Sequence, residues 1–162
     1  MKKFIITGLS VMLLVGCGAT KEKKVTEETQ QEQTVNAQQE SKYSFPEGVT
    51  SVGEGKVKVV TPDGTSENGN VPVVFIKKDT IIQQVEIELS NFQRDNETFV
   101  YIDKRFEEAH QVRKLTQTTI ELKEETLQPG VHTLTAIQYE NNDPNGKVIK
   151  FAEAKFENKP AQ

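Results

Sequence analysis

Few residues of this 162-residue chain have types and spacings that could support chemistry. It has one cysteine, Cys17, and two histidines, His110 and His132, with no His-Glu-x-x-His pattern and no second metal ligand at a diagnostic spacing. The five serines that follow Gly16 stand in neither a Gly-x-Ser-x-Gly nor a Ser-x-x-Lys pattern. The sequence therefore predicts no catalytic site, no metal site and no cofactor, and we expect a protein that is not an enzyme.

The acidic stretches of the sequence are interpreted as turns and strand edges rather than as binding sites. Residues 141–146 have the spacing of the first half of a calcium loop, but Ala152 stands where that loop would need its final glutamate. We interpret the segment as a turn. The adjacent pairs Glu107, Glu108 and Glu124, Glu125 are interpreted as solvated charges of turns or strand edges.

Cys17 stands at the boundary of an apolar segment. Lys2 and Lys3 precede a run of 12 mostly apolar residues, 4–15, and a Lys/Glu segment follows the cysteine. A helix that spans a bilayer needs about 20 apolar residues, so this run is too short for a stable membrane span. It is typical of a removable export signal, and the alternative is a buried N-terminal helix.

The segment Leu14-Val15-Gly16-Cys17 resembles the lipobox of bacterial lipoproteins, in which a small residue precedes a cysteine that receives a lipid before cleavage. The resemblance implies that residues 1–16 are a signal peptide and that Cys17 is the site of lipid attachment. Two acyl chains give a stable anchor where one gives only marginal binding. We therefore expect the protein on the extracytoplasmic face of a bacterial, Gram-positive-type cell membrane.

Residues 17–42 are expected to form a disordered linker between the anchor and a domain. Beyond Cys17 the segment has isolated valines, Val25 and Val35, no aromatic residue and five glutamines among mixed charges. Such a composition cannot bury enough apolar surface to offset the entropy of ordering. A solvated helix is the alternative, because Glu, Gln and Lys favour helices.

Residues 43–162 show short apolar alternations separated by turn-forming residues, and no amphipathic helix. The alternations predict seven strands, at residues 55–60, 71–76, 84–92, 97–102, 118–122, 130–140 and 147–156. This pattern predicts one all-β domain, a seven-stranded antiparallel β-sandwich. A small closed barrel is the competing architecture.

Residues 127–140, LQPGVHTLTAIQYE, are similar to the penultimate strand of immunoglobulin-like domains. In that family a turn ending in glycine leads into an alternating strand, and an aromatic residue near its start closes a corner. His132 occupies the place where the family often has tyrosine. The resemblance implies an Ig-like sandwich in which His132, Leu134 and Ala136 point inward, although the paired cysteines and core tryptophan of the family are missing here.

The charge balance limits the partners. The chain has a formal net charge of −4, and residues 43–162 contain 14 Lys and Arg against 19 Asp and Glu. No basic footprint of the kind that nucleic acid requires is present in the sequence, so we expect no nucleic-acid partner. The expected function is that of a monomeric, membrane-anchored module that binds or assembles with a protein at the cell envelope. A small-ligand or substrate-binding lipoprotein that serves a transporter is the alternative.

Overall fold

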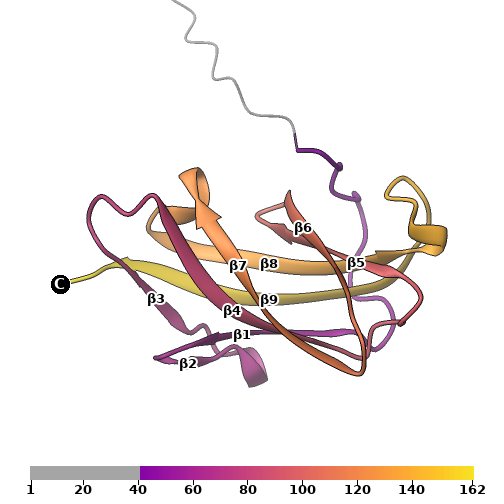
Figure 1. Cartoon of the computed structure of the whole chain (residues 1–162), viewed down its shortest axis with the longest axis horizontal. Coiled ribbons are helices and arrows are strands. Elements are labelled where there is room, and N and C mark those ends of the chain that lie inside the picture. Colours follow the sequence, from indigo (N-terminus) through magenta and orange to yellow (C-terminus); the bar gives the residue numbers. More distant parts are fainter. Residues whose placement is uncertain (1–40) are drawn as a thin grey trace, which may run out of the picture. The chain divides into compact units, whose positions relative to one another are not determined.

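The computed structural model describes residues 41–162, which form a two-layered, all-β domain (Figure 1). The strands are β1 (Lys56–Thr61), β2 (Gly64–Thr65), β3 (Val73–Ile76), β4 (Ile82–Ser90), β5 (Glu97–Ile102), β6 (Arg105–Gln111), β7 (Leu115–Lys123), β8 (Gly130–Tyr139) and β9 (Val148–Pro160). Three short 3₁₀ helices are η1 (Glu67–Gly69), η2 (Glu124–Leu127) and η3 (Glu140–Asn142). Within the described residues, no helix is long and apolar enough to cross a bilayer.

The strands form two sheets, with the orders β2-β1-β4-β7 and β3-β9-β8-β5-β6. Every neighbouring pair is antiparallel except β3, which runs parallel to β9. The chain changes sheet five times, between β2 and β3, β3 and β4, β4 and β5, β6 and β7, and β7 and β8. Two separate sheets confirm the predicted β-sandwich, and the alternative of a small closed barrel is wrong.

The core between the sheets follows from side-chain alternation along the strands. In β4, Val85, Ile87 and Leu89 are buried, whereas Glu86 and Glu88 alternate with them on the opposite face. The buried face packs against apolar residues of the other sheet, which include Val100, Ile102, Leu134 and Phe156. Each large apolar side chain that is fully buried contributes about 1.5–3 kcal/mol relative to an exposed one.

A second apolar cluster lies on the outer face of the five-stranded sheet, where the segment before β1 covers it. Tyr43 packs edge-on against Phe106 with ring centroids 4.7 Å apart, and Phe45 packs edge-on against Tyr101 at 5.3 Å. The hydroxyl of Ser41 accepts a hydrogen bond from the backbone N–H of Phe106 at 2.8 Å. These contacts secure the beginning of the domain near the predicted boundary at residue 43.

The predicted inward orientation of His132 is confirmed. The side chain is buried and stacks on Phe156, with ring centroids 5.3 Å apart. Its Nε2 lies 2.8 Å from the carbonyl oxygen of Gln128, four residues upstream, and its Nδ1 lies 2.6 Å from the Asp103 carboxylate. The ring thus closes the corner at the start of β8, and both nitrogens already have partners.

The structure adds two strands to the seven predicted, and both are edge strands. β2 has only two residues. β6 has no apolar alternation, and its pairing with β5 shifts register where Glu108 lies opposite Val100 and Phe106 opposite Tyr101. The residue between them, Glu107, is the extra residue of a β-bulge. A charged, bulged edge strand gives no hydrophobic period by which it could be recognised.

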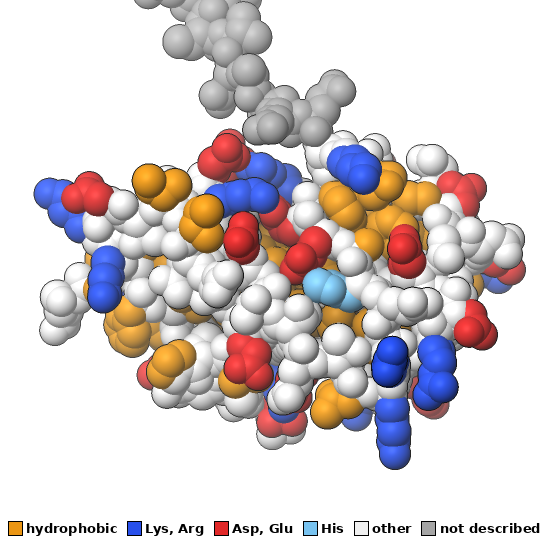
Figure 2. Space-filling view, viewed as in Figure 1, with side chains coloured by type: hydrophobic (Ala, Val, Ile, Leu, Met, Phe, Trp, Pro, Cys, Tyr) orange, Lys and Arg blue, Asp and Glu red, His pale blue; other side chains and the backbone are white. Residues whose placement is uncertain are grey.

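Charged side chains of both signs are interspersed on the face of the domain seen in Figure 2. The predicted signal peptide at residues 1–16, the lipid-attachment site Cys17 and the linker up to residue 40 lie outside the described residues. The interpretations of those segments stay predictions.

Candidate binding groove

The structure places the chemically interesting residues of the sequence apart from one another. His110 lies on β6, where its Nε2 is 3.0 Å from the carboxylate of Glu108. In the turn at residues 141–146, the side chain of Asp143 accepts a hydrogen bond from the backbone N–H of Asn145 at 3.0 Å. Among residues 41–162, no group of three or more His, Cys, Asp or Glu side chains could hold a metal ion.

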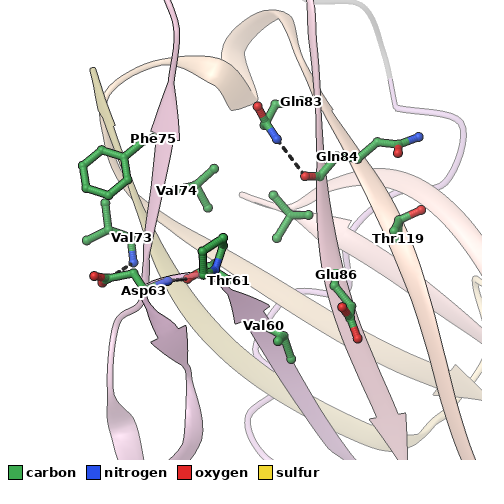
Figure 3. Close-up of a pocket in the computed structure, with 12 residues that line it drawn as sticks. Val60, Thr61, Asp63, Val73, Val74, Phe75, Gln83, Gln84, Glu86 and Thr119 are labelled. Carbon is green, nitrogen blue, oxygen red and sulfur yellow. Dashed lines mark hydrogen bonds between the residues drawn. The ribbon is translucent and has the colours of Figure 1, made fainter. Parts of the chain in front are cut away.

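A feature that the sequence analysis missed is a groove of about 690 Å³ between β3 and the first half of β4 (Figure 3). Apolar side chains from three strands, Val60, Val74 and Val85, line it, and Val74 and Val85 are buried. Phe75 stands at its rim and is 55% exposed. The groove therefore has an apolar lining within reach of solvent.

One wall of the groove is an edge of β4 that β1 leaves uncovered. The backbone N–H of Val59 donates to the Ser66 hydroxyl, and the C=O of Val59 accepts from the N–H of Ser66. Since main-chain groups alternate in direction along a strand, Val60 faces β4, where it lies opposite Glu86. This is the last pair between the two strands.

Proline explains why the pairing stops there. Pro62 directly follows β1 and, with Asp63, forms the turn that leads back into β2. If β1 continued, Pro62 would lie opposite Gln84 and would offer no backbone N–H to it. On this side of β4, the main-chain groups of Ile82 and of Gln84, which lines the groove, consequently have no pairing with β1. The side-chain amide of Gln83 donates to the Gln84 carbonyl at 2.9 Å and caps this edge locally (Figure 3).

The opposite wall is an uncovered edge of β3. The carbonyl groups of Pro72 and Ile76 accept hydrogen bonds from β9, so the main-chain groups of Val73 and Phe75 face away from that strand. The N–H of Val73 donates to the carboxylate of Asp63 at 3.2 Å (Figure 3). Two strand edges, each capped at one point by a side chain, thus border the same groove.

Exposed apolar side chains are frequent in the segment that contains β3 and the start of β4. Of the seven large hydrophobic residues that are exposed in the described chain, four lie between residues 71 and 82: Val71, Phe75, Ile81 and Ile82. Isolated exposed hydrophobic residues are ordinary, but a group of them beside a hollow is typical of an interaction surface.

Polar side chains also line the groove. Its polar side chains are those of Thr61, Asp63, Gln83, Gln84, Glu86 and Thr119. No histidine, cysteine or lysine is among the lining residues. The carboxylate of Asp63 already accepts the N–H of Val73.

A separate polar hollow lies between the edge strands β6 and β7. Glu107 lines it with a side chain that is only 5% exposed, and its Oε2 lies 3.5 Å from Nζ of Lys123. Its Oε1 is buried without a hydrogen-bond partner in the described part of the chain. Burial raises the pKa of the Glu107 carboxyl, and the nearby Lys123 and Arg105 oppose this shift.

The interpretation of Glu107 as a solvated charge is wrong, because the bulge in β6 turns this side chain toward the gap between the sheets. The same interpretation is confirmed for Glu124 and Glu125. Both side chains are exposed, and both form ion pairs with Arg105, at 3.4 and 2.7 Å.

Glu107→Gln is expected to raise the free energy of unfolding at neutral pH by about 1 kcal/mol, because it removes a buried charge that one partner only partly compensates. A raised folded-state pKa means that protonation favours the folded state. The wild type should therefore gain stability relative to the variant as the pH falls through that raised pKa. Urea unfolding of both chains across the acidic range measures this difference.

The control for this experiment is Glu121→Gln, which changes an exposed glutamate lining the same hollow. Its stability at neutral pH should stay close to that of the wild type, because this side chain is exposed. A Glu107→Gln chain that is less stable than the wild type at neutral pH would show that the ion pair with Lys123 outweighs the cost of burial.

None of the protein-family profiles matches the chain, and no curated protein matches it. Among solved structures, the fibronectin(III)-like modules of Clostridium thermocellum CbhA are similar, with 12% sequence identity and a TM-score of 0.39, over 67% of this chain and 100% of that chain. At this level the similarity carries no argument about activity or partners. The chain folds as an all-β sandwich, and this assignment follows from its own two sheets.

Proposed function

We propose that this protein is a non-catalytic surface lipoprotein, anchored through Cys17 to the extracytoplasmic face of the cell membrane, whose sandwich domain binds a protein partner at the envelope. The observation that carries the proposal is the groove between β3 and β4. It combines two uncovered strand edges with the exposed apolar residues at 71–82. Such a combination supports contact with another polypeptide, since both main chain and side chains can take part.

A small-ligand function has one observation in its favour, because a volume of about 690 Å³ is in the range of ligand pockets. The residues that form the walls of the groove favour a polypeptide ligand instead. Small-molecule sites usually enclose most of the ligand and converge a few polar groups on it. Here the side chains of Asp63 and Gln83 turn back to cap the main chain of the two edges.

The proposal is tested by photo-crosslinking on intact cells, with a photoreactive phenylalanine analogue in place of Phe75. Leu115 provides a matched control, because both residues are 55% exposed and Leu115 does not line the groove. We expect a discrete protein adduct from position 75 and none from position 115. Equal adducts from both positions, or none from position 75, would contradict a partner site at the groove.

A further inference from the structure

We propose that the groove binds an extended segment of the partner as an added strand beside residues 82–85 of β4, and that this segment carries a basic side chain between Asp63 and Glu86. The inference rests on the proposed function, because it assigns a binding mode and a partner chemistry to the same groove. The added strand would take the position that β1 leaves at Pro62.

The main-chain groups of β4 favour an added strand. Ile82 and Gln84 direct their N–H and C=O groups to the side where β1 pairs with the rest of β4, beyond the last pair at Glu86. A polypeptide placed there continues the line of β1 and extends the four-stranded sheet. Strand addition of this kind obtains its affinity from main-chain hydrogen bonds and its specificity from alternate side chains.

The existing caps are local and can be exchanged. The Gln83 amide that bonds the Gln84 carbonyl belongs to a short-range contact between neighbouring residues at an exposed position. It can turn to solvent when an incoming N–H takes its place. Side chains that cap an open edge in this way also protect it from indiscriminate pairing.

Apolar contacts also favour an added strand. The side chains of an added strand alternate between the two faces of the sheet. On the inner face they would meet Val74 and Val85, the buried residues of the groove, and on the way out they would pass Phe75 at the rim. The occupant should therefore have apolar residues at every second position.

The charges at the groove favour a basic partner segment. Asp63 and Glu86 approach the groove from the β3 and β4 sides (Figure 3). No lysine, arginine or histidine is among the residues that line it. The Asp63 carboxylate uses Oδ2 to accept the Val73 N–H, which leaves Oδ1 for an incoming cation. Charge complementarity thus favours a partner segment with Lys or Arg and disfavours an acidic one.

The test uses a display library of random ten-residue peptides, selected on the immobilised full chain in detergent. We expect enrichment of peptides in which apolar residues alternate with polar ones and at least one Lys or Arg is present. Asp63→Asn and Glu86→Gln should each weaken these peptides several-fold. Asn at position 63 can still accept the Val73 N–H, so this variant removes charge and keeps the cap.

Main-chain pairing is tested with Gln84→Pro and Gln84→Ala. Both remove the glutamine side chain, but only proline removes the N–H that faces the groove, and neither change touches a bond to β7. Binding of the selected peptides should fall at least ten-fold more in Gln84→Pro than in Gln84→Ala. Should the proline variant fail to fold, N-methylation of the peptides gives an independent measurement. N-methylation of the peptide residues whose N–H groups face β4 should abolish binding. N-methylation of the residues that alternate with them should leave binding unchanged.

The possible outcomes separate the inference from the function. Selected peptides that bind Gln84→Pro as well as wild type, enriched peptides that are acidic, or a chain that dimerises through the groove and takes up no peptide would each overturn the inference. A partner that crosslinks at position 75 and binds Gln84→Pro as well as wild type would support the proposed function and contradict strand addition. The absence of an adduct at position 75 would contradict both the proposed function and strand addition.

Discussion

Cys17→Ala is expected to abolish the incorporation of labelled fatty acid into this protein. The lipobox resemblance assigns the lipid to the sulfur of Cys17, the chain has no second cysteine, and alanine offers no acceptor. Without acyl chains the predicted stable anchor is lost. The variant should accumulate as uncleaved precursor or appear in the medium, as measured by metabolic labelling and cell fractionation.

Ala19→Ser is the matched control, because it introduces a nucleophilic side chain two residues away and keeps the thiol. It should be labelled and retained like the wild type. The melting temperature of the domain should be unchanged in Cys17→Ala, since both apolar clusters are built from residues between Tyr43 and Phe156. Normal labelling and membrane retention of Cys17→Ala would contradict the lipoprotein interpretation.

The lipid also bears on binding. An anchor confines the domain near its partners and raises their effective concentration. A weak surface interaction should depend strongly on this confinement. The adduct from position 75 should accordingly decrease on cells that produce the Cys17→Ala chain, even though the groove itself is unchanged.

The sequence predicted those strands whose side chains alternate between a wet and a buried face. Val85, Ile87 and Leu89 in β4 are the clearest case, because a period of two is visible whenever one face enters the core. β6 escaped prediction for the opposite reason. It is an edge strand, and the residues at its bulge, Glu107 and Glu108, are charged.

The groove could not be predicted from local pattern, because it depends on where β1 stops relative to β4 and on the crossing of the chain from one sheet to the other. Two local signals for it do exist. Pro62 removes the donor that would have continued the pairing with β4, and Pro72 precedes the strand that pairs with β9. Their meaning depends on the register, which the sequence alone does not supply.

The sequence predicts that Gln138 lies in a strand, but the role of its side chain is visible only in the structure. It lies on β8, is fully buried, and faces the loop between β4 and β5. Its Nε2 lies 2.8 and 2.9 Å from the carbonyl oxygens of Gln93 and Asn96 and 3.1 Å from the Thr98 hydroxyl, so its two N–H groups are shared among three acceptors. Its Oε1 accepts the backbone N–H of Gln93 at 2.8 Å. One part-buried side-chain network thus ties the main chain at Gln93 and Asn96 to β8.

Gln138→Leu is therefore expected to lower the free energy of unfolding by about 3 kcal/mol and the melting temperature by roughly 10 °C. Leucine fills a similar volume, so the loss comes from the main-chain groups of residues 93 and 96 rather than from a cavity. Thermal unfolding followed by circular dichroism, with both chains in the same detergent, measures the change. Amide exchange at residues 91–96 should accelerate before the rest of the domain opens.

Thr98→Val is the control, because it removes only the hydroxyl among the partners of Gln138. It should cost about 1 kcal/mol, the usual value of one hydrogen bond. The ratio of the two losses is the decisive quantity. If Gln138→Leu costs no more than Thr98→Val, the loop between β4 and β5 finds other partners for its main chain, and the buried amide is not what holds that end of the sandwich closed.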